Sequence, residues 1–282
     1  MEVRHVDSLT DTNYWDRTWA NRTVPNPLDP NQGTLNGTVA RSFHRFFERV
    51  FGSLDVKPGD LLLEAGCGGS VFLPYFCKQF GLAAEGLDNS EEGCGLSQAI
   101  SEKSAITTRI LLGDVLNPPE SLFERYRVVF SLGLAEHFQP TTDIVAALKA
   151  LVQPSGFLIT IVPNMHGAMG LLQRLVDPSV YAVHVPLSPR ELADAHRSCG
   201  LEVVEASYLM TVNFSVLNFS GPGSRVPARI GLRIASWVSK AIWTFEKIFP
   251  QIPNGITSPF VAVVARKPAS SPSTIAEPLL RK

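Results

Sequence analysis

Apolar residues occur along this chain either in short continuous runs or at helical spacing. The first helical stretch is 38–54, where Phe43, Phe47 and Val50 recur at intervals of three and four residues. Short apolar runs, typical of strands buried in a parallel sheet, follow at 61–63, 83–87, 108–112, 127–132 and 157–162. Helices are expected between these runs at 71–80, 91–103 and 141–152. Strands that alternate with helices predict an α/β fold with a doubly wound, mostly parallel sheet and right-handed crossovers.

The alternation loosens after residue 163. We expect an inserted helix and loop at 165–187, and then a helix that begins at the capping sequence Ser188-Pro189-Arg190-Glu191. Two last strands are expected at 201–208 and 259–265, separated by an insertion. The predicted domain is single, 1–266, with these parts: an N-terminal lid and helices at 1–54, a cofactor-binding core at 55–165, and substrate-side insertions at 165–187 and 209–258. The remaining residues, 267–282, are polar and proline-rich and resemble a disordered tail.

Composition and charge narrow the functional class. Hydrophobic residues make up 45% and charged residues 18% of 282, which suits a folded domain with a sizeable core. The formal net charge is −1, so we expect no nucleic acid as partner. The four cysteines have no CxxC spacing and no neighbouring histidines, which favours reduced thiols and a cytoplasmic location. No stretch is apolar for the ~18 residues that a spanning helix needs, so stable membrane insertion is not expected.

A glycine-rich turn follows the first predicted strand. It reads Leu63-Glu64-Ala65-Gly66-Cys67-Gly68-Gly69-Ser70 and leads into a predicted helix. Glycines allow a sharp bend and a close approach of the backbone to a ligand. In doubly wound sheets, ligands bind at the carboxyl ends of the strands. A turn of this kind also serves plain helix–strand packing, so by itself it does not decide the function.

Three carboxylates lie near successive strand ends. Asp88 ends the second predicted strand, where a carboxylate can accept hydrogen bonds from ribose hydroxyls. Asp114 ends the third, where a carboxylate can accept from an exocyclic adenine amine, and Glu64 comes just before the glycine turn. Each acid alone would be an ordinary surface residue or cap. Together they predict a nucleoside site.

With these motifs the sequence resembles the class I methyltransferases that use S-adenosyl-L-methionine. LLLEAGCGGS is similar to their first motif, GLDNS to their acidic ribose loop and LLGDVLNPP to their adenine loop, and the resemblance covers about 55–165. It implies a seven-stranded sheet in which 259–265 is antiparallel. It implies that Glu64, Gly66 and Gly68 hold the methionine part, Asp88 the ribose, and Asp114 with Val115 the adenine. The full set of implied cofactor contacts is Glu64, Ala65, Gly66, Cys67, Gly68, Asp88, Asn89, Gly113, Asp114, Val115 and Leu132.

The first motif departs from the family pattern at one position. The usual third glycine is displaced, and Ser70 stands where it would be, a residue that fits a helix N-terminus. The same stretch argues against a nicotinamide site, because GxGxxG would need glycine at 71 and the chain has Val71.

Glu136 and His137, which follow the fourth predicted strand, are the candidate catalytic residues. A histidine near neutrality suits the base that a hydroxyl acceptor needs, although the resemblance supports a cofactor contact for this pair equally well. Similar quinone-pathway methyltransferases have an acid three residues earlier, which supports metal binding. Here that position is Gly133, so we expect no metal.

The predicted substrate residues lie in the lid and beside the first insertion. Tyr14, Trp15 and Trp19 fit a lid across the cofactor, and an anchor for the first helix is the equal alternative. His166 and His184 flank the 165–187 insertion and are candidates to line the acceptor pocket. The amphipathic segment 229–249 has four interpretations: core packing, a pocket wall for an apolar acceptor, a homodimer contact, or a peripheral membrane contact.

The resulting hypothesis is an enzyme that transfers a methyl group from S-adenosylmethionine to a small molecule, including an apolar or secondary metabolite. Oxygen is the preferred acceptor atom, followed by carbon or nitrogen. The alternatives are a catalytically silent nucleotide-binding scaffold, and a methyltransferase acting on protein or RNA, which would need a basic or extended groove.

Overall fold

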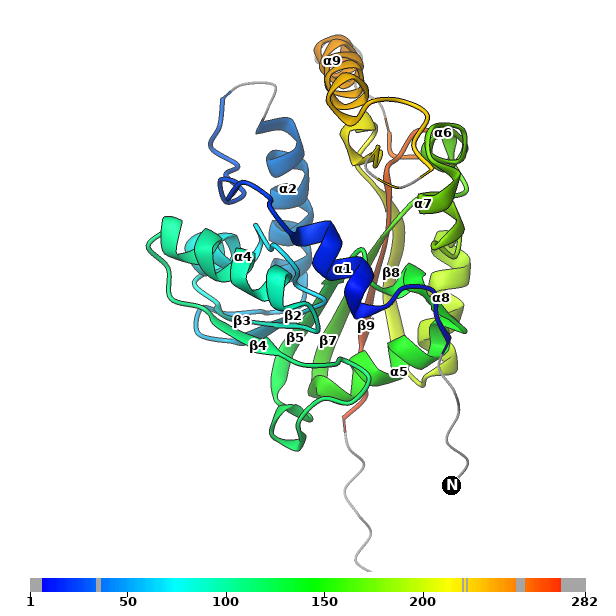
Figure 1. Cartoon of the computed structure of the whole chain (residues 1–282). Coiled ribbons are helices and arrows are strands. Elements are labelled where there is room, and N and C mark those ends of the chain that lie inside the picture. Colours follow the sequence, from blue (N-terminus) through cyan, green and yellow to red (C-terminus); the bar gives the residue numbers. More distant parts are fainter. Residues whose placement is uncertain (1–6, 34–36, 220, 222, 247–251, 270–282) are drawn as a thin grey trace, which may run out of the picture.

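The computed structural model describes residues 7–33, 37–219, 221, 223–246 and 252–269. Seven strands form one sheet in the order β4-β3-β2-β5-β7-β9-β8 (Figure 1). Their bounds are β2 (Leu61–Ala65), β3 (Ala83–Asp88), β4 (Arg109–Leu112), β5 (Tyr126–Leu132), β7 (Val152–Pro163), β8 (Glu202–Leu209) and β9 (Phe260–Arg266). Strand β9 is antiparallel to both of its neighbours, and β4, β3, β2, β5 and β7 pair in parallel. The predicted mostly parallel sheet with one antiparallel strand is confirmed.

Helices cover both faces of the sheet, as a doubly wound fold requires. Helices α2 (Thr38–Ser53) and α3 (Leu73–Phe80) pack on one face, and α5 (Thr141–Leu151) and α8 (Pro189–Ser198) pack on the other. Helix α4 (Glu91–Lys103) lies beside α3 and contacts β3 and β4. The bounds of α2, α3, α4 and α5 agree with the sequence expectations to within two residues.

Phenylalanines dominate the core beneath α2. The Phe47 ring is fully buried at the centre of this cluster. Aromatic rings surround it within 6.4 Å between centroids: Phe43, Phe46, Phe51, Phe72, Tyr75, Phe76 and Phe130. The phenylalanines that recur at helical spacing in α2 therefore build the core on one face of the sheet through contacts between aromatic rings.

Two predicted elements differ from the structure. Strand β7 begins at Val152 rather than at 157, because Val152 already pairs with Tyr126 ahead of a bulge in the ladder. The 165–187 segment forms two helices, α6 (Ala168–Val176) and α7 (Pro178–Ala182). Asp177 divides them, since its carboxylate accepts hydrogen bonds from the amides of Ser179 and Val180 and so caps α7.

Helix α8 begins as the sequence predicts. The Ser188 hydroxyl accepts from the Glu191 amide, and the Glu191 carboxylate accepts from the Ser188 amide, which is a complete capping box.

The second insertion contains the helix α9 (Ala228–Glu246), which lies at the same end of the molecule as α6 (Figure 1). Its inner face packs on residues 212–219 through buried Ala235 and Trp243, and the Trp243 indole donates to the carbonyl of Val212. Core packing of the inner face is therefore observed. Residues 247–249 of the predicted amphipathic segment and 270–282 of the predicted tail lie outside the described residues.

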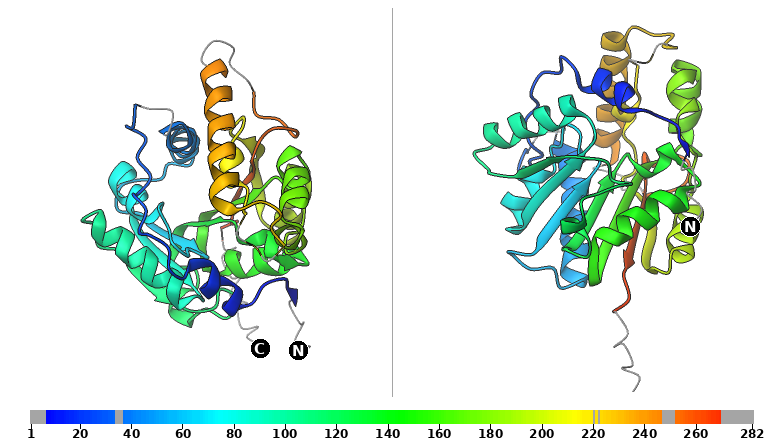
Figure 2. Two further views of the ribbon diagram at one scale, coloured as in Figure 1. Left: turned by 45° about the horizontal axis from the view of Figure 1, so that its top comes forward. Right: turned by 60° about the horizontal axis from the view of Figure 1, so that its bottom comes forward.

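The N-terminal segment crosses the sheet near the carboxyl ends of its parallel strands (Figure 2). Strand β1 (Asp7–Ser8) pairs with β6 (Phe138–Gln139), and helix α1 (Thr12–Trp19) packs against α4. Short 3-10 turns complete the chain: η2 (Glu120–Leu122), η3 (Ala135–His137) and η4 (Phe214–Val216). Among the described residues, no helix has both the length and the apolar character that crossing a bilayer demands. The division into one domain, 1–266, with a separate tail stays a prediction.

Candidate active site

The loop between β2 and α3 bends at two glycines with left-handed backbone. Gly66 has φ +70° and Gly68 has φ +44°, values that favour glycine. The Gly66 amide donates to the Leu87 carbonyl at 2.8 Å, which ties the loop to the end of β3. A Cβ at Gly68 would overlap the indole ring of Trp19. The loop therefore needs glycine at 68 both for its bend and for the close contact with the lid.

Ser70, the residue in place of a third glycine, caps the start of α3. Its Oγ accepts from the amides of Phe72 and Leu73 at 3.0 and 3.1 Å and donates to Oε2 of Glu64 at 2.5 Å. Both Ser70 and Glu64 are buried. Burial raises the pKa of Glu64 from 4.5 to about 8, against a smaller lowering by the Ser70 hydrogen bond. Ser70 therefore stabilises the loop through side-chain hydrogen bonds that a glycine at this position could not form.

The raised pKa of Glu64 predicts a pH dependence of stability. Between pH 4.5 and about 8 the folded protein keeps a proton that the unfolded chain releases. Because the folded state binds more protons there, the unfolding free energy should fall as the pH rises through this window. Glutamine at position 64 does not titrate, so in Glu64→Gln the slope of the unfolding free energy against pH should be smaller by the contribution of about one proton. Urea unfolding of the cofactor-free protein at several pH values measures this slope. An unchanged slope would contradict the assignment.

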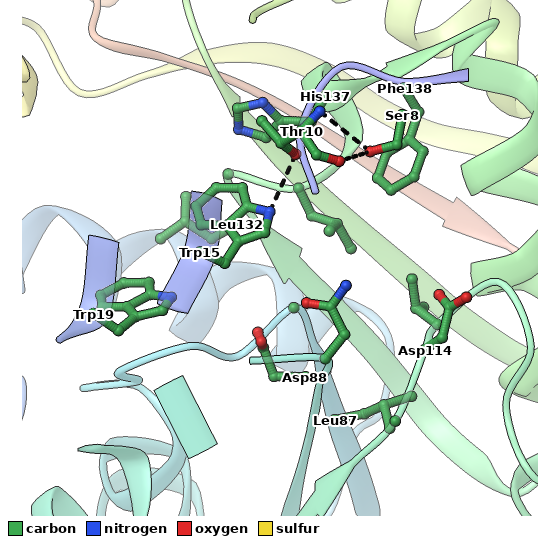
Figure 3. A pocket seen from close by; sticks show the side chains of 16 residues that line it. Ser8, Thr10, Trp15, Trp19, Leu87, Asp88, Asp114, Leu132, His137 and Phe138 are labelled. Carbon is green, nitrogen blue, oxygen red and sulfur yellow. Dashed lines mark hydrogen bonds between the residues drawn. The ribbon is translucent and has the colours of Figure 1, made fainter. Parts of the chain in front are cut away.

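A crevice opens at the carboxyl ends of β2, β3, β4 and β5 (Figure 3). Its walls include most of the predicted cofactor residues: Gly66, Asp88, Asn89, Gly113, Asp114, Val115 and Leu132. The lid contributes Ser8, Thr10, Trp15 and Trp19, and the η3 segment contributes Gly133, Leu134, His137 and Phe138. Leu87 completes the lining. The four other predicted contacts lie outside this lining, and their role in cofactor binding stays a prediction: Glu64, Ala65, Cys67 and Gly68.

The two aspartates keep hydrogen-bonding capacity toward the crevice. Asp88 accepts from the amides of Gly68 and Ser90 at 2.7 and 2.8 Å, one on each carboxylate oxygen. Asp114 accepts from the Leu116 amide at 2.9 Å. Burial raises the pKa of Asp88 above its usual value, although the backbone amides that donate to its carboxylate act in the opposite direction. Each carboxylate oxygen has a further lone pair, so both groups can also accept from ligand hydroxyls or amines.

Two tryptophans of α1 roof the crevice. The Trp19 ring lies against Gly68 and Gly93, and the Trp15 ring meets the His137 ring edge-on at 5.0 Å. The Ser90 hydroxyl donates to Asp16 at 2.6 Å and joins α1 to the start of α4. The sequence left open whether these tryptophans form a lid or merely anchor the first helix. Both rings line the crevice, as the rings of a lid would, and the lid stays a prediction.

We expect Gly68→Ala to disturb this lid. The added methyl group would meet the Trp19 ring in a backbone conformation that costs alanine about 1–2 kcal/mol. Binding of S-adenosylhomocysteine, measured by calorimetry, should weaken about tenfold. In Gly68→Ala/Trp19→Ala the overlap disappears, so the two substitutions should be non-additive. The control is Gly95→Ala on α4, where a methyl group meets open space. Additive effects, or equal losses in the control, would argue against the contact.

Glu136 and His137 lie on η3, next to a histidine from another segment. His184 follows α7, and its ring centroid is 4.5 Å from that of His137. The Nε2 of His137 is 3.8 Å from Oε1 of Glu136. Burial raises the pKa of Glu136 to about 8 and lowers that of His137 to about 3, and it also lowers that of His184. Only His137 of the three lines the crevice.

Three predicted substrate residues lie outside the crevice: Tyr14, His166 and His184. Tyr14 lines a neighbouring cavity between α1 and α7, together with Arg17, Arg22 and Val183. His166 is half-exposed, pairs with Glu191 at 3.2 Å and lines neither cavity. Sequence reasoning missed Ser8 and Thr10. The only local signal for them was their position a few residues before the lid tryptophans, and β1–β6 pairing places them in the crevice.

A family model described as a methyltransferase domain matches residues 33–206, more than half of the chain. The chain belongs to this methyltransferase family. The match begins before α2 and ends within β8, so it contains the glycine loop, both crevice aspartates and the Glu136-His137 pair.

Curated relatives and solved structures agree with the family. The methyltransferase is 27% identical over 159 residues to a ubiquinone biosynthesis O-methyltransferase of Burkholderia thailandensis, covering 52% of this chain and 67% of the relative. It is 25% identical over 166 residues to the enzyme of that name from Bordetella avium, covering 56% and 67%. A geranyl diphosphate C-methyltransferase from Streptomyces coelicolor, solved with Mg²⁺, geranyl diphosphate and S-adenosylhomocysteine, shares the fold, with TM-score 0.55, 14% identity and coverage of 91% and 97%. So does a methyltransferase from Archaeoglobus fulgidus, with TM-score 0.52, 18% identity and coverage of 84% and 96%.

The methyltransferase uses S-adenosylmethionine, as the sequence predicts, and the crevice suits it. Asp88 has acceptor oxygens that suit ribose hydroxyls, and Asp114 has acceptor oxygens that suit the adenine amine.

Proposed function

We propose that this enzyme transfers the methyl group of S-adenosylmethionine to an oxygen atom of a small-molecule acceptor. The observation that carries the proposal is His137, which lines the crevice beneath the lid. Its Nδ1 donates to the carbonyl of Val183 at 2.7 Å, so Nε2 is the nitrogen left to accept a hydrogen bond. The names of the curated relatives support oxygen as the acceptor atom.

The chain's own residues then supply positioning more than bond chemistry. Bound S-adenosylmethionine supplies the electrophilic methyl group. The glycine loop and the two aspartates hold the cofactor, Trp15 and Trp19 exclude water, and His137 accepts a hydrogen bond from the acceptor hydroxyl. Such positioning lowers the barrier of an in-line displacement, because the reacting atoms are held close together in a dry site.

The cavity between α1 and α7 is our proposed place for the body of the acceptor. It has a volume of about 770 Å³ and is lined by Tyr14, Arg17, Arg22, Val180 and Val183, among others. The last two residues are also the ones whose carbonyls accept from His184 and His137. This wall therefore lies against His184 and against His137, the histidine that lines the crevice.

Turnover with a panel of hydroxylated aromatic acids and their O-methylated forms tests the proposal. We expect release of S-adenosylhomocysteine with the free hydroxyl compounds and no release with the O-methylated forms. Binding of S-adenosylhomocysteine without turnover against this panel or a metabolite extract would favour the silent scaffold. Methyl transfer to protein or RNA alone would overturn the small-molecule acceptor.

The outer face of α9 is the candidate contact surface for two predicted partners, a second copy of the chain and a membrane surface. Five of its large apolar side chains are exposed, with Arg229 and Arg233 beside them: Ile230, Leu232, Ile234, Trp237 and Phe245. These residues line neither the crevice nor the cavity between α1 and α7. Such a face supports a contact with a second copy or with a membrane surface, and both contacts stay predictions, as do the cytoplasmic location and the absence of a nucleic-acid partner.

A further inference from the structure

Three potential metal ligands converge behind the crevice wall. Glu136, His137 and His184 each offer one nitrogen or oxygen atom, and these atoms all lie within 4.8 Å of one another. Glu136 and His137 come from η3 and His184 comes from the end of α7. The first two are buried and the third is half-buried. The fold therefore assembles two imidazoles and one carboxylate in a protected place.

Backbone carbonyls orient both imidazoles in the same way. Nδ1 of His137 donates to the Val183 carbonyl at 2.7 Å, and Nδ1 of His184 donates to the Val180 carbonyl at 2.6 Å. This leaves an Nε2 lone pair on each ring. Metal-binding histidines are characteristically held through the other ring nitrogen in this manner, because the outer hydrogen bond fixes both tautomer and ring direction.

The carboxylate of Glu136 lacks a partner that its burial calls for. Its Oε2 is fully buried and has no hydrogen-bond partner within the described part of the chain. Its other oxygen, Oε1, lies 3.8 Å from Nε2 of His137, and no lysine or arginine among the described residues forms an ion pair with this carboxylate. Leaving a buried carboxylate oxygen unpaired is costly, and a cation would remove that cost.

We infer that Glu136, His137 and His184 form a binding site for one divalent transition-metal ion, of which Zn²⁺ is the best match. Two imidazoles with one carboxylate and an open position is a ligand set of catalytic zinc sites. Mg²⁺ and Ca²⁺ prefer oxygen ligands and fit this set less well. The sequence led us to expect no metal, because Gly133 replaces an acid. The third ligand instead comes from His184, 47 residues after His137.

The cluster is close to the size that such an ion requires. Ligands at Zn²⁺ distances in a tetrahedron are about 3.4 Å apart. Nε2 of His137 and Oε1 of Glu136 are 3.8 Å apart, so only small side-chain movements are needed there. His137 also lines the crevice, which provides a path for the ion. With the ion bound, Nε2 of His137 is one of its ligands, so the acceptor hydroxyl would bind to the cation, which polarises it, in place of His137. That role rests on the proposed function, whereas metal binding itself does not.

Metal binding by the full chain tests the inference without any acceptor. After treatment with a chelator and dialysis, we expect calorimetry to show one tight Zn²⁺ site per chain, and Co²⁺ to give visible absorption bands of a low-coordinate site. His184→Ala should weaken Zn²⁺ binding by about 100-fold or more, since even outer-shell changes cost 10–100-fold. The isosteric Glu136→Gln should weaken it as well and guards against loss through misfolding, with the melting temperature measured for each variant.

The matched control is His166→Ala, because His166 also lies beside a glutamate but outside the cluster. It should bind Zn²⁺ like the unaltered chain. The inference is overturned if no stoichiometric Zn²⁺ binding occurs, or if folded His184→Ala and Glu136→Gln bind Zn²⁺ as tightly as the control. Failure of the methyl-transfer proposal would look different, since Zn²⁺ and S-adenosylhomocysteine would both bind while no hydroxylated acceptor was methylated.

Discussion

Replacing Asp88 by alanine should weaken binding of S-adenosylhomocysteine by about 1–3 kcal/mol, which corresponds to roughly 5- to 150-fold in Kd. The carboxylate lines the crevice and would accept from the ribose hydroxyls of the bound cofactor. It also holds the amides of Gly68 and Ser90, so its loss leaves two buried donors without their acceptor. Both effects act on the cofactor site, and the loss should appear in calorimetry with S-adenosylhomocysteine and with S-adenosylmethionine alike.

Two companion variants show whether the effect is specific. Asp88→Asn keeps the size of the side chain and one acceptor oxygen, so it should give an intermediate loss. Asp194→Ala removes an exposed carboxylate of α8 that pairs only with surface arginines, and it should leave the affinity unchanged. If Asp88→Ala binds S-adenosylhomocysteine as tightly as the unaltered protein, Asp88 is not a cofactor contact.

Replacing Phe47 by alanine should lower the unfolding free energy by about 3–5 kcal/mol. The ring is fully buried and surrounded by other aromatic rings, so its removal leaves a cavity that rigid neighbours cannot fill. For a domain of this size we expect the melting temperature to fall by roughly 6–20 °C. Urea unfolding followed by circular dichroism measures the free-energy change.

Phe123→Ala serves as the matched control, because that ring is 43% exposed and its loss should cost under about 1 kcal/mol. Equal losses in both variants, or a small loss in Phe47→Ala, would mean that the aromatic cluster beneath α2 does not carry the stability assigned to it.

The regular elements were predictable because each has a local cause. The phenylalanine spacing of α2, the serine cap of α8 and the continuous apolar runs of β2, β3 and β5 act over a few residues. The start of β7 was predicted too late, since Pro154-Ser155-Gly156 has the composition of a turn. Pairing of Val152 with Tyr126 overrides that composition, and such pairing is not visible in the local sequence.

The cofactor crevice was also largely predictable. Gly66 follows β2, Asp88 ends β3 and Asp114 comes two residues after β4, and parallel strands bring their carboxyl ends to one edge. The position of Glu64 could not be foreseen in the same way. Its carboxylate accepts a hydrogen bond from the Ser70 hydroxyl, six residues later in the chain, and lies outside the crevice lining.

The sequence by itself determined the doubly wound sheet, the glycine bend and the two aspartates at the strand ends, because periodicity and strand-end chemistry are local properties. Only the tertiary structure decided that Trp15 and Trp19 line the crevice and that His184 lies beside His137 and Glu136. These contacts join segments far apart in the chain, and they depend on how an inserted helix and an N-terminal strand pack. Such packing follows from the summed burial of many side chains, which no short stretch of sequence records.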